Sequence, residues 1–248
     1  RLMAASRIDL IYSGGFFRPS VSVVEATSTM FPKGSTTRVM AVGDSLTQGQ
    51  GAESIGGYRL ALWNRMKANG FQFIPAGYQT QPPYTNNGDP YFGSRWSGYG
   101  GWKIGDLMGT GANNNTGKAM PQWIAENTPS VLLLMIGTND LSETSNLTTL
   151  RGRFTALLDQ SYTAKTDMHI VLGRVPHYQT TTWQAVTDYN NMCVQELTSR
   201  VAANPARKMA VANMETIRGS SKYADYVHFN ASGYAEATDA WYNAIVAA

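Results

Sequence analysis

Apolar runs alternate with amphipathic stretches along most of the chain. Five apolar runs of strand length lie at 38–43, 71–77, 130–137, 168–175 and 208–214. Helical patterns lie between and after them, at 57–70, 118–127, 149–165, 183–203 and 232–248. Because several of these strands are apolar throughout, both faces of their sheet must be covered, as in a parallel sheet flanked by helices. The alternation predicts a doubly wound α/β domain with a five-stranded parallel sheet.

The last two helical patterns show which residues should face the core. Apolar residues recur every three or four positions, which is typical of an amphipathic helix. In 183–203 the predicted inward residues are Trp183, Val186, Tyr189, Cys193, Leu197 and Val201. In 232–248 they are Tyr234, Ala237, Trp241 and Ile245. The chain has one cysteine, so an internal disulfide and a cysteine-based zinc site are excluded, and Cys193 is interpreted as a packing residue.

The first 36 residues do not follow this alternation. They contain two β-rich runs separated by Gly14 and Gly15. We predict an N-terminal β-rich segment at 1–36 and a main domain at 37–248. Two interpretations of the segment stay open: the tail of a larger β domain, or a strand pair that lies on the main domain.

Composition and charge narrow the class of protein. The chain has 248 residues, 43 % of them apolar, and a net charge of only +3. This is typical of a globular protein, and with no basic run it predicts no nucleic-acid partner. The longest apolar stretch, 131–136, is too short to span a membrane. Since the chain begins at Arg1 without a signal peptide, we interpret it as a processed or trimmed product and expect a secreted protein.

Polar residues that could take part in catalysis follow three of the predicted strands. Ser45 follows the first strand, Asn139 the third, and Asp225 and His228 come after the fifth. In α/β sheets, ligands bind beyond the carboxyl ends of the strands. Taken singly, each residue has a structural explanation: Ser45 as a helix cap, Asn139 as a turn residue, His228 as a structural histidine. Of the other two histidines, His169 begins a strand, and His177 lies in a loop where it could rim a pocket.

Together these residues fit serine catalysis. A serine becomes nucleophilic when a histidine accepts its proton, and a carboxylate fixes the tautomer of that histidine. Ser45, His228 and Asp225 can fill these roles. Two elements of other known sites are missing: Thr47 breaks the Gly-x-Ser-x-Gly pattern of α/β-hydrolases, and "GYGGWKIGDL" lacks the ending of a phosphate loop.

Four blocks carry a resemblance to a known family. They are "GDSLTQGQG", "GYGGWKI", "GTND" and "DYVHFNASGYAEAT", in this order, within 38–248. In these blocks the chain resembles the SGNH hydrolase superfamily, also called GDSL esterases. The resemblance implies a flavodoxin-like three-layer α/β/α sandwich and ester hydrolysis without a metal or other cofactor. It also implies a catalytic triad of Ser45, Asp225 and His228.

The same resemblance implies an oxyanion hole. Its donors are the backbone N–H groups of Ser45 and Gly101 and the side-chain amide of Asn139, with Gly100 as the alternative to Gly101. The second and fourth blocks are also similar to acetylxylan-esterase-like carbohydrate esterases.

The loop at 78–102 suggests the substrate class. It is rich in aromatic residues, and exposed aromatic faces beside polar groups suit sugar rings; alternatively, these aromatics pack the loop onto its own domain. The predicted substrate contacts are Asp44, Trp96, Tyr99 and Trp102. The leading hypothesis is an esterase that removes acetyl groups from a polysaccharide or oligosaccharide through an acyl-enzyme. The alternatives are a small-ester or lysophospholipid hydrolase and a non-catalytic glycan-binding module.

Overall fold

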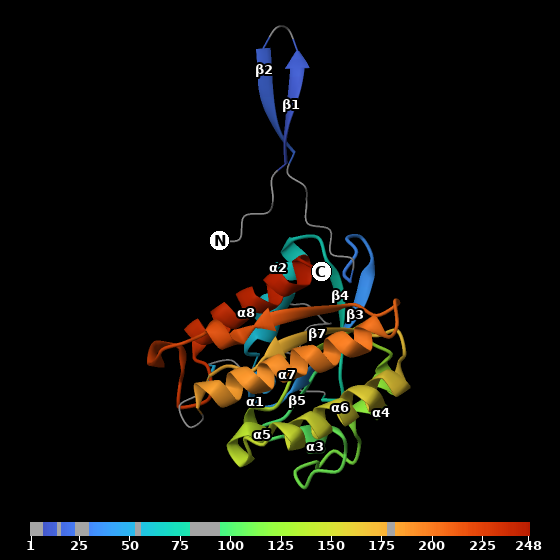
Figure 1. Ribbon diagram of the computed structural model, residues 1–248, viewed down its shortest axis with the longest axis vertical. Coiled ribbons are helices and arrows are strands. Elements are labelled where there is room, and N and C mark those ends of the chain that lie inside the picture. Colours follow the sequence, from blue (N-terminus) through green and yellow to red (C-terminus); the bar gives the residue numbers. More distant parts are fainter. Residues whose placement is uncertain (1–6, 14–15, 23–29, 53–55, 80–94, 178–181) are drawn as a thin grey trace.

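The computed structural model describes residues 7–13, 16–22, 30–52, 56–79, 95–177 and 182–248. Its centre is a parallel sheet whose five main strands have the order β4-β3-β6-β7-β8 (Figure 1). Their bounds are Gln72–Ala76 (β4), Thr36–Gly43 (β3), Val131–Met135 (β6), His169–Arg174 (β7) and Met209–Asn213 (β8). A sixth strand of two residues, β5 (Ser97–Gly98), also pairs with β3. The five predicted strands are therefore confirmed, and the chain order across the sheet is that of a flavodoxin-like fold.

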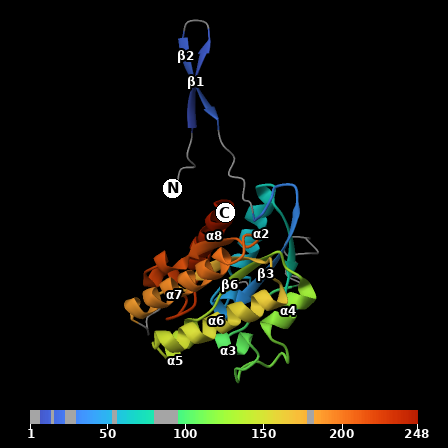
Figure 2. The same ribbon diagram turned by 45° about the vertical axis from the view of Figure 1, so that its right-hand side comes forward.

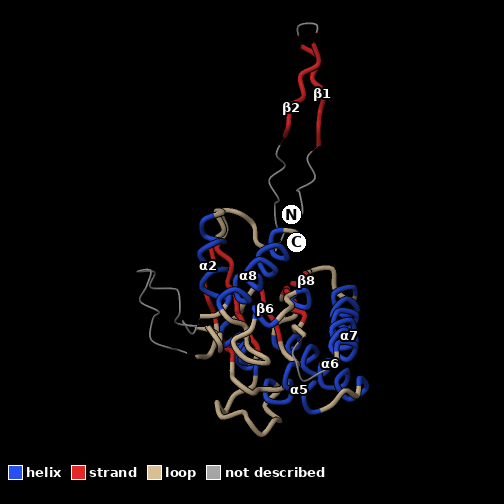
Figure 3. Tube along the Cα trace, turned by 90° about the vertical axis from the view of Figure 1, so that its left-hand side faces the viewer, coloured by secondary structure: helices blue, strands red, loops and turns tan. Residues whose placement is uncertain are grey.

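Helices cover both faces of this sheet. The helices α2 (Tyr58–Ala68) and α8 (Ala231–Val246) pack together on one face. The opposite face carries α4 (Met120–Asn127), α6 (Leu147–Ala164) and α7 (Trp183–Ala202), and Figure 3 shows the two groups on either side of the strands. In Figure 2, α6 and α7 run side by side. The predicted α/β/α sandwich is confirmed.

The core explains why the strands are apolar throughout. Every residue of β6, the central strand, is buried because helices lie on both of its faces. Gly173 in β7 lies so close to the ring of Trp241 that a Cβ there would be 2.8 Å from it. The four inward residues predicted for α8 are all buried, as are Val186, Tyr189, Cys193 and Leu197 of α7. Burial raises the pKa of the Cys193 thiol, in accord with a packing role.

The prediction was wrong at one end of α7. Trp183 is 55 % exposed, although the periodicity places it on the inward face. It is the first residue of the helix, directly after the N-cap Thr182. The helical period predicts which side of the helix a residue lies on, but not whether the core extends as far as the first turn.

The N-terminal part contains a hairpin and a buried connection. Strands β1 (Arg7–Ser13) and β2 (Phe16–Ser22) pair antiparallel in a sheet of their own, apart from the main sheet in Figure 1. Met30 and Phe31, in contrast, are buried in the main core, where the Phe31 ring lies 5.1 Å from that of Phe73. These two residues, which precede the predicted boundary at 36/37, therefore pack in the core of the main domain, and the division into two segments stays a prediction. The origin of the hairpin in a larger β domain stays a prediction.

Short helices follow the carboxyl ends of the strands. They are α1 (Ser45–Gln48), α3 (Ile104–Leu107), α5 (Thr138–Glu143), η2 (Met214–Thr216) and η3 (Ser220–Lys222). The residues proposed for chemistry lie on or beside these segments.

Candidate active site

Ser45 begins α1 immediately beyond β3. Asp44 is the N-cap of this helix, and its Oδ1 accepts the N–H of Leu46 at 3.0 Å. The strand can turn here because Gly43 has no side chain: a Cβ would clash with the Met135 carbonyl oxygen and the Thr47 hydroxyl. The turn leaves Ser45 at the carboxyl edge of the sheet with 4 % of its surface exposed.

His228 and Asp225 lie on a short loop between η3 and α8. The loop is closed at its base by a bridge between Tyr223 and Phe229 and by the hydrogen bond from the Ala224 N–H to the His228 carbonyl at 2.8 Å. His228 Nε2 lies 2.9 Å from Ser45 Oγ, and His228 Nδ1 lies 2.7 Å from Asp225 Oδ2. The fold thus brings together three residues of which two, Ser45 and His228, are 183 positions apart in the chain.

Hydrogen bonds to the Asp225 carboxylate lower its pKa. Burial alone would raise its pKa, but hydrogen bonds from the His228 ring and from the backbone N–H groups of His228 and Val227 outweigh burial and lower it. The backbone bonds to Oδ1 measure 2.7 and 2.8 Å. Because a carboxylate accepts hydrogen bonds, this contact assigns the proton of a neutral His228 to Nδ1, which leaves Nε2 to accept the Ser45 proton.

Asn139 lies near the start of α5, directly beyond β6. Its side-chain Nδ2 donates one hydrogen bond to the Trp102 carbonyl at 2.9 Å, and the amide carries a second N–H. The neighbouring Asp140 accepts the Ile104 N–H at 2.9 Å. These two bonds tie the start of α5 to the segment that carries the predicted glycine donor.

Gly100 and Gly101 lie in the turn that precedes Trp102. The turn starts beside β3, because the Tyr99 N–H bonds the Gly43 carbonyl at 3.1 Å, and it closes with the bond from the Trp102 N–H to the Tyr99 carbonyl at 3.2 Å. Gly101 has φ +76°, which disfavours any side chain, whereas a Cβ at Gly100 would lie 2.5 Å from Gln50 Nε2. Both N–H groups lie in one turn between Ser45 and Asn139, so the assignment of the donor to Gly101 stays a prediction.

The predicted substrate contacts are wrong for the described aromatic residues. Trp96, Tyr99 and Trp102 are all buried. Tyr99 and Trp102 stack at 4.0 Å and both lie against Trp123, while the Arg59 guanidinium lies 4.1 Å from the Trp96 ring. These rings pack the loop onto its own domain, which was the alternative interpretation. The other aromatics of that loop, Tyr84, Tyr91 and Phe92, lie outside the described residues.

Asp44 is also no substrate contact in this structure. Its side chain is fully buried, and burial raises its pKa to about 6. Its role here is to cap α1, the helix that begins at Ser45.

Sequence reasoning missed a second residue that supports α1. Arg59, on α2, is buried and donates from Nε to the Thr47 carbonyl at 2.9 Å and from Nη2 to the Gln48 carbonyl at 3.2 Å. A cation that bonds the last carbonyls of a helix stabilises its C-terminus. An arginine within an apolar helical pattern is the one signal that could have indicated such a bond.

Two kinds of feature are absent from the residues that the structure describes. Within the described ranges, no three histidine, cysteine, aspartate or glutamate side chains gather as a metal site would require. Among the helices of those same ranges, none has the length and apolar character needed to cross a membrane.

The family comparison agrees with this geometry. Residues 41–236 match the model of the GDSL-like Lipase/Acylhydrolase family, which is more than half of the chain. The chain belongs to this family. It is therefore a carboxylic ester hydrolase of the GDSL esterase group, as the four sequence blocks predicted.

Relatives of this GDSL esterase extend the comparison. It is 27 % identical over 233 residues to a multidomain esterase of Ruminococcus flavefaciens; the match covers 90 % of this chain. The chain spans only about 30 % of the length of that curated relative.

Solved structures agree with the fold. A family 3 carbohydrate esterase of Clostridium thermocellum has a TM-score of 0.68 at 23 % identity, covering 85 % of this chain and 95 % of its own. A family 3 carbohydrate esterase from Talaromyces cellulolyticus has a TM-score of 0.67 at 17 % identity, covering 84 % and 95 %. An acetyl xylan esterase from Geobacillus stearothermophilus has a TM-score of 0.56 at 17 % identity, covering 88 % and 97 %. At these identities the structures show a shared fold.

Proposed function

We propose that this GDSL esterase removes acetyl groups from a polysaccharide or oligosaccharide through an acyl-enzyme on Ser45. The observation that carries the proposal is the continuous hydrogen-bonded series from Asp225 through His228 to Ser45 Oγ. The sugar substrate is supported by the names of the similar proteins, which are carbohydrate and acetyl xylan esterases.

The first half of the proposed reaction forms the acyl-enzyme. Ser45 Oγ attacks the ester carbonyl carbon while its proton moves to His228 Nε2. Asp225 stabilises the imidazolium that results. The oxyanion of the tetrahedral intermediate accepts hydrogen bonds from the Ser45 N–H, the Gly101 N–H and the Asn139 amide. When the intermediate collapses, His228 returns the proton to the sugar oxygen, which leaves as a hydroxyl group.

The second half releases acetate. A water molecule attacks the acetyl carbonyl carbon, and His228 Nε2 accepts its proton. The same donors stabilise the second oxyanion. Ser45 Oγ then leaves with the proton from His228, so acetic acid is formed and the triad returns to its first state.

A panel of acetylated glycans tests the substrate. Acetylated xylan, mannan and chitin oligosaccharides are compared with p-nitrophenyl esters from acetate to decanoate and with a lysophospholipid. We expect acetate release from at least one glycan and the fastest p-nitrophenyl turnover on acetate. Hydrolysis of the lysophospholipid or of long esters, without acetate release from any glycan, would instead support the small-ester or lysophospholipid hydrolase.

The Ser45→Ala variant tests the nucleophile. We expect a circular dichroism spectrum like that of the wild type and loss of activity on every ester in the panel, because no other side chain is bonded to His228 Nε2 within the described residues. A folded variant with near-normal turnover would contradict the serine mechanism.

Since the proposed substrate is a polymer, the proposed place of action is outside the cell, and recovery of the activity from culture medium checks it.

A further inference from the structure

A cavity of about 160 Å³ lies beside the loop that carries Asp225 and His228. It opens between the segment that follows β7 and the segment that follows β8. Its lining includes His177, Trp183, Arg218, Ser220, Tyr223 and Tyr226. The prediction that His177 could rim a pocket is confirmed.

The cavity is bordered by two aromatic rings that the fold leaves open. Trp183 is 55 % exposed and Tyr226 is 58 % exposed, and among residues 30–52, 56–79, 95–177 and 182–248 no other large hydrophobic side chain is exposed. Isolated exposed aromatics are common on proteins, but here both border the same cavity. The Trp183 ring is also positioned by its neighbours: the His177 ring stacks on it at 4.7 Å, and the Arg218 guanidinium lies 4.2 Å from its centre.

The cavity adjoins the loop that carries Asp225 and His228. Tyr226 directly follows Asp225 in the loop whose other end is His228. At the base of the same loop, the Tyr223 hydroxyl donates a hydrogen bond to the His177 carbonyl at 2.6 Å. A ligand in this cavity would therefore lie along the triad loop.

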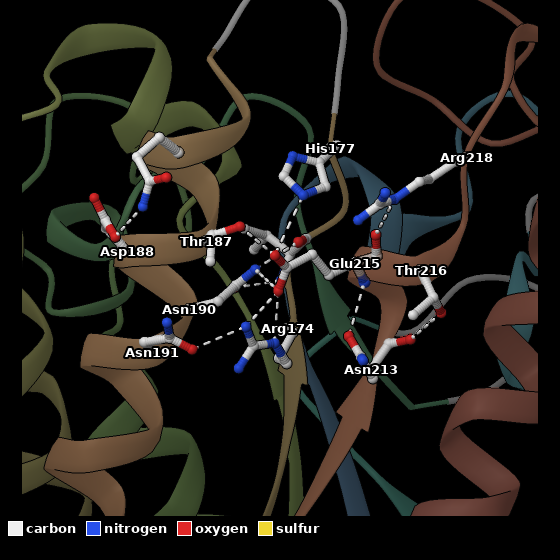
Figure 4. Close-up of polar contacts among 12 residues, drawn as sticks. Arg174, His177, Thr187, Asp188, Asn190, Asn191, Asn213, Glu215, Thr216 and Arg218 are labelled. Atoms are coloured by element: carbon white, nitrogen blue, oxygen red, sulfur yellow. Dashed lines mark hydrogen bonds and ion pairs between the residues drawn. The ribbon is translucent and has the colours of Figure 1, made fainter.

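One buried carboxylate joins the segments that form the cavity walls. In Figure 4, side chains from β7, from the segment after it and from α7 converge on Glu215 of η2. Glu215 accepts hydrogen bonds from Arg174 Nε at 2.8 Å, from Asn190 Nδ2 at 3.3 Å, and from the Thr187 hydroxyl, and it contacts His177 Nε2 at 3.2 Å. Only 8 % of its surface is exposed. Burial alone would raise the pKa of Glu215, but the bonds from Thr187 and Arg174 outweigh it and lower the pKa.

This network makes the cavity a preformed feature. His177 and Thr187, which lies one turn after Trp183 on α7, are both bonded to the same carboxylate, and Arg218 Nε donates to the Glu215 carbonyl at 3.3 Å. Because His177 and Arg218 are held in place before a ligand arrives, a ligand loses little free energy in ordering these two side chains.

We propose that this cavity is a subsite for a second sugar ring of the glycan that carries the acetyl ester, with the sugar packed against the exposed parts of the Trp183 and Tyr226 side chains. The proposal rests on the proposed function. A pyranose ring presents C–H groups on its faces and hydroxyls at its edge, and an aromatic site with a few placed polar groups matches both. Arg218 and Ser220 are the donors within reach of the edge. An acyl chain would instead require a continuous apolar lining, which Arg218 and Ser220 interrupt.

The test compares oligosaccharide with small ester. The acetylated glycan that the wild type hydrolyses fastest is prepared as oligosaccharides of two to six sugars. For each variant we measure kcat/KM on these and divide it by kcat/KM on p-nitrophenyl acetate. Trp183→Ala should lower this ratio about tenfold, which corresponds to about 1.4 kcal/mol of binding free energy, and Trp183→Phe should retain most of it.

A matched control removes a different surface ring. Tyr242, on α8, is half-buried and lies 3.9 Å from the Arg65 guanidinium, so it too is an aromatic ring stacked with an arginine. Tyr242→Ala should leave the ratio unchanged. Titration of the deacetylated oligosaccharide into Ser45→Ala, with and without Trp183→Ala, measures binding without turnover and should show the same tenfold loss.

Each other outcome is informative. If the wild type releases acetate from the glycan but Trp183→Ala keeps the same ratio and the same affinity, the subsite is wrong and the proposed function stands. If the wild type releases acetate from no glycan, the proposed function is wrong. If Trp183→Ala converts a dimer to a monomer in sedimentation velocity, the exposed rings form an interface between copies, and the subsite is wrong.

Discussion

Replacing Asp44 by asparagine should stabilise the protein, and only above a certain pH. The Asp44 carboxyl is fully buried, and burial raises its pKa from 3.8 to about 6. Its pKa in the unfolded chain is close to the lower value, so between these values the folded state binds the proton more tightly. Stability therefore falls as the pH rises through this window, and the whole penalty is present above about pH 6.

The magnitude follows from the rise in pKa. A rise from 3.8 to about 6, at about 1.36 kcal/mol per pKa unit, corresponds to about 3 kcal/mol. The asparagine side chain would keep an oxygen that can accept the Leu46 N–H, now bonded at 3.0 Å, but it would carry no charge. At pH 8, Asp44→Asn should therefore raise Tm by up to about 6–12 °C for a domain of this size. At pH 4 the gain should be nearly absent, because the wild-type carboxyl is then largely protonated.

Thermal unfolding of wild type, Asp44→Asn and Asp44→Ala at pH 4, 6 and 8 measures this. Asp44→Ala is the control, because it removes the charge and the cap together and should lose about 1 kcal/mol relative to asparagine at every pH. A Tm difference between asparagine and wild type that does not change with pH would refute the buried-charge argument. A large rise in KM for an acetyl ester in Asp44→Asn would restore Asp44 as a substrate contact.

Three further outcomes are expected. In steady-state kinetics, Asn139→Ala should lower kcat about 10²–10³-fold with little change in KM. Asn139→Asp should be at least as damaging, since a carboxylate donates no hydrogen bond and repels the oxyanion. If Asn139→Asp keeps most of the wild-type kcat, Asn139 is not part of the oxyanion hole. Dialysis against a strong chelator should leave the rate unchanged, and a loss restored by zinc or calcium would contradict the serine mechanism. Gly101→Ala should lower the free energy of unfolding, measured with denaturant, by about 1–2 kcal/mol because of its left-handed φ alone. Gly43→Ala should lower it far more, because the new Cβ would clash with the Met135 backbone, and equal losses for the two variants would contradict this packing.

The strands and helices were predictable because their pattern is local. A strand covered on both faces is apolar throughout, and a helix covered on one face has apolar residues every three to four positions. The structures of 130–137 and 232–248 can therefore be predicted from their own residues. The same locality explains the error at Trp183. Its position on the helix face is local information, but the extent of the core beneath it depends on the neighbouring segments.

The residues of the candidate site were predictable for a different reason. Ser45, Asn139, Asp225 and His228 all follow strands, and the carboxyl ends of parallel strands meet at one edge of the sheet. Their identities come from the sequence. The distances of 2.9 and 2.7 Å along the Ser45–His228–Asp225 series depend on long-range contacts, such as the bonds from the Tyr234 hydroxyl of α8 to the Leu46 and Gln50 carbonyls.

What a side chain touches was decided only by the tertiary structure. By sequence, Trp96, Tyr99 and Trp102 are as suited to sugar rings as Trp183 and Tyr226 are. Folding buries the first three against Trp123 and Arg59 and leaves the other two open beside the triad loop. Exposure is set by atoms that are distant in the chain. The four motif blocks of the sequence therefore identified the family and its chemistry, whereas long-range packing decided which aromatic rings a substrate can reach.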